Sequence, residues 1–292
     1  MKRILLFFLL TSFLVNAQIP YGSNPKVGKR IQVGDISMYY EIYGKGEPLI
    51  LLHGGFGSSE MMGGMIAAFS KKYQVIAVDS RSQGRTTDSD EKELSYAQMA
   101  LDVNGFMDLL HIKKAKFVGW SDGGDIALEL ALIHPEKITK AVIMGANFLG
   151  ESKGVFLGID TTWKMDAKDP LFAKTKPELV KYFSTYERLA PDKKKIESSR
   201  KKVSENAFKN PNITLAQLKS IQVPFLVMAG DHDMFTLEHT IAMYQNLPQA
   251  SLYIVPDATH ISPFEEPELV HAEILRYLGK PYRKLDAFYF WK

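Results

Sequence analysis

Short apolar runs recur along the chain, separated by longer amphipathic stretches. Six runs have fully apolar centres: Pro48–Leu52, Gln74–Val78, Ala115–Val118, Lys140–Met144, Val223–Met228 and Ser251–Val255. Runs of this kind are typical of strands buried on both faces, as in a parallel sheet covered by helices. A hairpin is predicted before them, because Arg30–Val33 and Ser37–Tyr43 flank the turn Gly34-Asp35.

The amphipathic stretches between the runs predict helices. They cover Glu60–Lys71, Tyr96–Leu110, Asp125–His134, Leu237–Asn246 and Pro267–Leu278. Regular alternation of strand and helix predicts an α/β fold with a doubly wound, mostly parallel sheet. We assign residues 18–146 and 217–292 to this core.

Residues 147–216 interrupt the alternation and predict a helical cap insertion. They lack a buried-strand run, and Pro170–Leu189 and Asp192–Phe208 are predicted as helices. The lysines of this segment are interpreted as a solvated helical face. Its aromatic residues are expected to pack over the carboxyl edge of the sheet, where ligands bind in this architecture; they are Trp163, Phe172, Tyr182, Phe183 and Tyr186.

The first 17 residues predict a cleaved signal peptide. Lys2 and Arg3 precede the apolar run Ile4–Leu14, and small residues follow up to Ala17. The run is too short for a membrane anchor, since spanning a bilayer takes about 20 apolar residues. We therefore expect cleavage near Ala17, no membrane anchor in the mature chain, and a periplasmic or secreted protein.

Composition removes several functional classes. With 46% hydrophobic residues and nearly balanced charge, the chain can bury a core and is not disordered. Without cysteine it has no disulfide, no Cys-ligated metal and no thiol nucleophile. Loss of Lys2 and Arg3 would leave a formal charge of +1, which gives no reason to expect nucleic acid as a partner.

The strongest chemical signal is the sequence Gly119-Trp120-Ser121-Asp122-Gly123-Gly124 between a predicted strand and a predicted helix. A serine on such a turn needs strained backbone angles, and small residues two before and two after it let the turn close. Ser121 is therefore the candidate nucleophile, with Trp120 beside it as a candidate substrate-binding residue.

A serine hydroxyl needs a base, and the base needs an acid. His260 is the candidate base because it follows the last strand of the sheet, at the edge that carries Ser121. Asp233 is the candidate acid, with Asp231 as the alternative on the same turn, whereas Asp257 is close enough to His260 for a local hydrogen bond only. The remaining histidines have structural explanations, and His53 is expected to fix a glycine turn.

The oxyanion of an acyl-transfer intermediate needs N–H donors. One is predicted from the glycine loop after Pro48–Leu52, at Gly55 or its neighbour Phe56, which is also a candidate substrate-binding residue. The other is predicted from Asp122. A phosphate-binding loop is excluded because no Gly-Lys-Ser/Thr sequence follows. A metal cluster at Asp231, His232, Asp233 and His239 is disfavoured, so neither metal nor cofactor is expected.

These features together resemble the α/β-hydrolase superfamily over nearly the whole mature length. Three features match the arrangement typical of that superfamily: the chain order Ser121, Asp233, His260; the His-Gly-Gly loop; and the cap insertion. The segment Asp79–Thr86 is similar to the superfamily's D-x-R-G-x-G-x-S loop, but departs from it at Ser82, where glycine is usual, and at Thr86. Serine at position 121 argues against haloalkane dehalogenases and epoxide hydrolases, which have aspartate there.

The elbow is similar to that of the biphenyl-hydrolase-like and valacyclovir-hydrolase branch, which implies a serine hydrolase of a small-molecule ester, lactone or amino-acid ester. In that branch the residue matching Asp122 is associated with an amino group of the substrate; the structural alternative is that Asp122 caps the following helix. A carbon–carbon bond hydrolase and a non-catalytic ligand-binding protein are the alternative functions.

Overall fold

The computed structural model describes residues 19–89, 93–150 and 184–285. The predicted signal peptide lies outside these residues and stays a prediction. So do the cap aromatic residues other than Tyr186, and the part of the predicted helix Pro170–Leu189 before residue 184.

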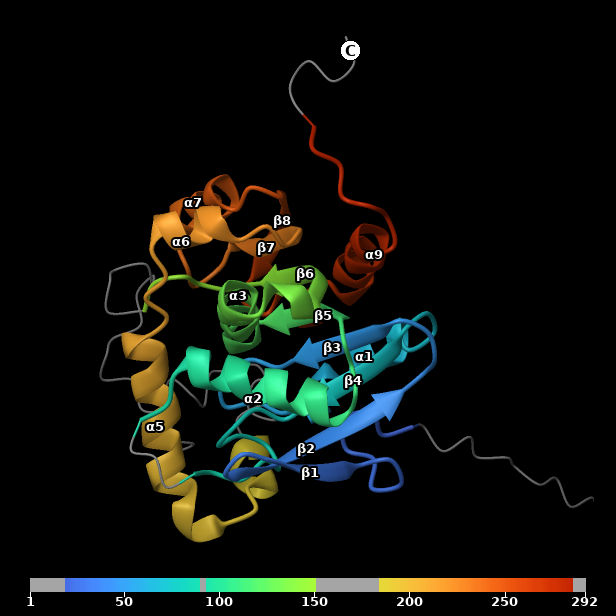
Figure 1. Cartoon of the computed structure of the whole chain (residues 1–292), viewed down its shortest axis with the longest axis vertical. Coiled ribbons are helices and arrows are strands. Elements are labelled where there is room, and N and C mark those ends of the chain that lie inside the picture. The colour runs from blue at the N-terminus through green and yellow to red at the C-terminus, as the bar shows by residue number, and fades with distance from the viewer. Residues whose placement is uncertain (1–18, 90–92, 151–183, 286–292) are drawn as a thin grey trace, which may run out of the picture.

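The described residues form an eight-stranded sheet in the order β1-β2-β4-β3-β5-β6-β7-β8 (Figure 1). Only the pairs β1–β2 and β2–β4 are antiparallel, so the predicted doubly wound, mostly parallel sheet is confirmed. The strands are β1 (Lys29–Val33), β2 (Ile36–Tyr43), β3 (Pro48–Leu52), β4 (Gln74–Val78), β5 (Ala115–Trp120), β6 (Ile138–Met144), β7 (Phe225–His232) and β8 (Ala250–Thr259).

Helices cover both faces of this sheet. The α-helices are α1 (Gly63–Phe69), α2 (Tyr96–Leu109), α3 (Asp122–Ile133), α5 (Ile196–Lys209), α6 (Leu215–Ser220), α7 (Leu237–Asn246), α8 (Ser262–Glu265) and α9 (Pro267–Leu278). Short 3-10 turns lie at η1 (Ser59–Met62), η2 (Pro135–Lys137) and η5 (Lys193–Lys195). Residues 184–189 are also helical.

The apolar strand runs divide their side chains between two cores. In β3, Ile50 and Leu52 join the cluster that includes buried residues of α2 and α3. Leu49 and Leu51 join the cluster that includes residues of α1 and α9. Because successive side chains of a strand point to opposite faces, an uninterrupted apolar run is what a strand between two helical layers requires.

Four elements differ from the predictions, two in their boundaries and two in being unpredicted. Helix α3 begins at Asp122 rather than Asp125, directly after Ser121. Strand β8 continues to Thr259 through the segment predicted as a loop, with Asp257 at a φ of 54°. Helices α6 and α8 are short and were not predicted from the pattern.

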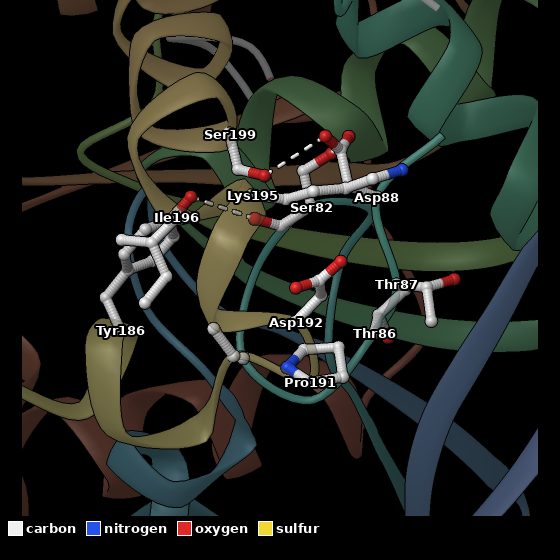
Figure 2. A pocket seen from close by; sticks show the side chains of 12 residues that line it. Ser82, Thr86, Thr87, Asp88, Tyr186, Pro191, Asp192, Lys195, Ile196 and Ser199 are labelled. Carbon is white, nitrogen blue, oxygen red and sulfur yellow. Dashed lines mark hydrogen bonds between the residues drawn. The ribbon is translucent and has the colours of Figure 1, made fainter. Parts of the chain in front are cut away.

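The described part of the predicted insertion packs on the loop between β4 and α2. Tyr186 donates a hydrogen bond to the carbonyl of Ser82 at 3.1 Å, and Lys202 forms an ion pair with Asp88 at 2.6 Å. Figure 2 shows the contact of Tyr186 with Ser82 beside a cavity of about 330 Å³, where Ser199 also donates a hydrogen bond to Asp88. The cavity lies at the junction of insertion and core.

The two ends of the insertion meet beside each other. Leu149 and Asn212 form an isolated antiparallel bridge, and the N–H of Ile213 donates to the carbonyl of Phe148 at 2.9 Å. Within the described ranges, no helix has the length and apolar character needed to cross a membrane.

Candidate active site

Ser121 occupies a strained turn between β5 and α3. Its φ of 53° and ψ of −125° are unusual for a residue with a side chain. The turn closes because its neighbours are glycines: a Cβ on Gly119 would lie 2.2 Å from the carbonyl oxygen of Gly123. A Cβ on Gly123 would lie 2.4 Å from the carbonyl oxygen of Leu52 on β3. The elbow geometry predicted from the sequence is therefore present.

His260 and Asp233 meet Ser121 at the carboxyl edge of the sheet. His260 Nε2 lies 3.0 Å from Ser121 Oγ, and His260 Nδ1 lies 2.9 Å from Asp233 Oδ1. The side chain of Asp233 is 1% exposed and that of His260 is 12% exposed. A neutral imidazole that donates Nδ1–H to Asp233 presents the lone pair of Nε2 to the serine hydroxyl.

Asp231, the alternative acid, is occupied elsewhere. Its carboxylate accepts the N–H of Ala258 at 3.1 Å, and backbone hydrogen bonds from Asp257 and Ala258 help hold its pKa below the ordinary value. It therefore secures the end of β8 instead of contacting the imidazole.

The other buried histidines have structural contacts. His53 is fully buried; its Nε2 accepts the N–H of Ser80 at 3.0 Å, and its Nδ1 lies 2.7 Å from the carbonyl of Gly54. His239 stacks on Phe148 with ring centroids 4.2 Å apart, and burial lowers the pKa of His239 to about 4. The expectation that His53 fixes the glycine turn agrees with these contacts.

The glycine loop that contains Gly55 lies against Ser121 and Asp122. A Cβ on Gly54 would lie 3.1 Å from Ser121 Cβ, and a Cβ on Gly55 would lie 2.8 Å from Asp122 Oδ2. Phe56, the alternative donor, has a φ of 60° and its ring contacts that of Tyr186 at a centroid distance of 5.6 Å. The glycine loop and the start of α3 thus border the same space as Ser121.

The loop Asp79–Thr86 packs against the glycine loop and hydrogen-bonds to the segment that follows it. Asp79 is buried and accepts the N–H of Ser59 at 2.7 Å and that of Arg85 at 2.8 Å. Ser82 has a φ of 64°, a conformation in which glycine is usual, and its hydroxyl donates to Asp88. Thr86 keeps a hydroxyl where the related motif has serine, and donates it to the carbonyl of Asp79 at 2.6 Å.

Asp122 does not cap the following helix, so that interpretation is wrong. It is the first residue of α3, and its Oδ1 accepts the hydroxyl of Tyr96 at 2.9 Å. Its Oδ2 is buried and has no hydrogen-bond partner within the described part of the chain. Burial raises the pKa of Asp122 to about 6, while the hydrogen bond from Tyr96 opposes that rise. Tyr96 was not found from the sequence, because only the fold brings α2 against the elbow.

The prediction that Trp120 binds substrate is corrected by its position. Its side chain is 3% exposed, and its ring packs against Phe264 with centroids 5.0 Å apart. Its indole N–H donates to the carbonyl oxygen of His260 at 2.8 Å. Trp120 therefore lies behind the histidine and away from open space.

No cluster of three or more His, Cys, Asp or Glu side chains that could hold a metal occurs among residues 19–89, 93–150 and 184–285. The arrangement that is present is a nucleophile, a base and an acid, next to two backbone segments able to supply N–H donors.

Comparisons with known proteins agree with this geometry. Residues 47–177 match the family model described as the alpha/beta hydrolase fold. The chain is 27% identical over 249 residues to the serine hydrolase BPHL of Mus musculus, covering 79% of each chain. It is 28% identical over 257 residues to the 2-hydroxy-6-oxononadienedioate/2-hydroxy-6-oxononatrienedioate hydrolase of Comamonas testosteroni, covering 81% of this chain and 89% of the relative.

A solved structure of a hydrolase from Pseudomonas aeruginosa PA01 has the same fold, with a TM-score of 0.69 and 22% identity over 88% of this chain and all of the other. Sheet order, the strained serine turn, the family model and the solved structure agree that the chain has the α/β-hydrolase fold.

Proposed function

We propose that the protein is a serine hydrolase that cleaves a small-molecule carboxylic ester through an acyl-enzyme. The observation that carries the proposal is the continuous contact from Ser121 Oγ to His260 and on to Asp233, with distances of 3.0 Å and 2.9 Å. The three side chains directly follow β5, β7 and β8 and meet at the carboxyl edge of the sheet, and acyl transfer needs all three together.

In the first half-reaction, Ser121 Oγ attacks the ester carbonyl while its proton moves to His260 Nε2. Asp233 stabilises the imidazolium and keeps Nδ1 as the protonated nitrogen. The tetrahedral intermediate collapses, and the leaving alkoxide takes the proton from Nε2. The alcohol departs and the acyl group stays on Ser121.

In the second half-reaction, water gives a proton to His260 Nε2 as its oxygen attacks the acyl carbonyl. Collapse of the second intermediate returns the proton to Ser121 and releases the carboxylic acid. The intermediates' oxyanion is held by the N–H of Asp122 and that of Gly55 or Phe56. The Phe56 conformation, with its φ of 60°, and the contacts of His53 and Asp79 hold that loop in place.

A second candidate is hydrolysis of a carbon–carbon bond by the same triad. The Comamonas relative favours it, because its name gives a 2-hydroxy-6-oxo dienedioate as substrate, a compound without an ester bond, and the match covers 81% of this chain. Both candidate functions need Ser121, so only the identity of the substrate that is turned over can distinguish them.

The deciding assay combines a substrate panel with active-site labelling. We expect turnover of p-nitrophenyl esters from acetate to octanoate, and stoichiometric labelling of Ser121 by a fluorophosphonate that abolishes it. Ser121→Ala is the matched control and should lose both signals. Turnover of a 2-hydroxy-6-oxo-dienoate at a higher kcat/KM than any ester would favour the second candidate. Absence of turnover and of labelling in the folded protein would favour a non-catalytic binding protein.

Export is a separate proposal. If residues 1–17 are cleaved, N-terminal sequencing of the protein from a periplasmic or culture fraction should start at Gln18. Recovery of uncleaved chain from the cytoplasmic fraction alone would contradict it.

A further inference from the structure

Trp120 touches three segments that build the site. It precedes Ser121 in the chain and ends β5. A Cβ on Gly54, in the glycine loop, would lie 2.8 Å from its indole ring. On its other side its ring meets Phe264 of α8 and lies 5.5 Å from the ring of His260.

The main chain of His260 has little support from the sheet. Strand β8 ends at Thr259, one residue before the histidine, and its last pairs are irregular between Gly230 and His232. The carbonyl of His260 accepts a hydrogen bond from the indole N–H of Trp120 at 2.8 Å. This bond joins residues 140 positions apart in the chain.

Because of this bond, His260 is held by two adjacent residues of the elbow. Ser121 contacts the imidazole of His260 through its side chain, and its neighbour Trp120 contacts the carbonyl of the same histidine. The strained elbow fixes Ser121, so the indole of the adjacent residue fixes the histidine relative to the nucleophile. Proton transfer is sensitive to sub-ångström changes in such a distance.

We propose that Trp120 is a positioning residue of the hydrolytic reaction: its indole N–H anchors the main chain of His260 and keeps Nε2 on Ser121 Oγ. It does so without contacting substrate, since the side chain is 3% exposed. This inference rests on the proposed serine hydrolase function. It differs from simple core packing, which would need the ring but not its N–H.

The test removes the N–H and leaves the ring. Site-specific incorporation of 3-benzothienylalanine at position 120 replaces the indole nitrogen by sulfur and keeps the bicyclic shape. Loss of one neutral hydrogen bond to the base should lower kcat for a p-nitrophenyl ester by about tenfold, with KM unchanged within about twofold. Trp120→Phe should show the same division between kcat and KM, with a larger loss of thermal stability because the ring is smaller.

Phe264→Leu is the matched control, because it loosens the packing of Trp120 and leaves the N–H in place. We expect it to lower the melting temperature and keep kcat within about threefold of the unmodified protein. A kcat within twofold for the benzothienylalanine protein, in a preparation where Ser121→Ala is inactive, overturns the positioning role. An active Ser121→Ala protein would overturn the proposed function itself.

Discussion

Replacing Asp122 by asparagine should change how the stability of the protein depends on pH. The carboxyl is 7% exposed, and burial raises its pKa from 3.8 to about 6. In the unfolded chain the group ionises near its ordinary value, whereas in the folded protein it ionises only near pH 6. Folding therefore opposes ionisation, and the free energy of unfolding falls as pH rises from about 4 to 6.

The rise in pKa sets the size of this effect. At about 1.4 kcal/mol for each pH unit, a rise from 3.8 to about 6 corresponds to about 3 kcal/mol. This cost is absent below pH 3.8, fully present above pH 6, and missing at every pH in Asp122→Asn. The variant keeps an acceptor for Tyr96, but it places a buried amide N–H₂ where Oδ2 has no partner among the described residues. The free-energy cost of burying this amide does not depend on pH. The test is therefore how the difference in unfolding free energy between the two proteins changes with pH.

Urea unfolding at pH 4, 5, 6, 7 and 8 measures the free energy of unfolding for both proteins. The difference between variant and unmodified protein should shift in favour of Asp122→Asn by about 2.4 kcal/mol between pH 4 and pH 8, because part of the full cost is already present at pH 4. Asp108→Asn is the control, because Asp108 is exposed and its ion pair with Lys137 lies at the surface; its shift should stay within about 1 kcal/mol. A difference for Asp122→Asn that is flat across this range would refute the burial argument.

Three further outcomes are expected. Ser121→Ala and His260→Ala should each lower kcat by orders of magnitude, and the double variant should be little worse than either, whereas multiplied losses would contradict a shared mechanism. Asp122→Asn should lower kcat/KM for an amino-acid ester by roughly tenfold and spare the matching neutral ester; equal losses would remove the charge selection that the related branch implies. Gly145→Ala should lower kcat by at least about tenfold, because Gly145 has a φ of 54° and a Cβ there would lie 2.7 Å from His260 Nδ1, so wild-type kcat in this variant would argue against that crowding.

The sheet and the grouping of the site residues could be predicted because their signals are local. Apolar runs bounded by turns define strands, and parallel strands place the residues after their carboxyl ends at one edge. Ser121, Asp233 and His260 each follow or end such a strand, and the structure brings them within hydrogen-bond distance.

What the sequence did not predict depends on contacts between distant segments. Tyr96 reaches Asp122 from α2 at 2.9 Å, and nothing near either residue indicates this partnership. Trp120 is predicted to bind substrate because it adjoins the serine, but its side chain is buried in the core that includes residues of α1 and α9, and its N–H contacts His260. Helix α3 begins at Asp122, three residues before the predicted start, because the serine turn leads directly into the helix.

The bridge between Leu149 and Asn212 has a consequence for how such proteins diversify. With these two residues paired, the chain leaves and re-enters the sheet domain at nearly one point. Segments of different length and sequence can therefore be exchanged between these positions without changing the spacing of β6 and β7. Descendants of one ancestral gene can therefore differ in this single stretch, while the strands that precede the serine, the aspartate and the histidine are inherited unaltered.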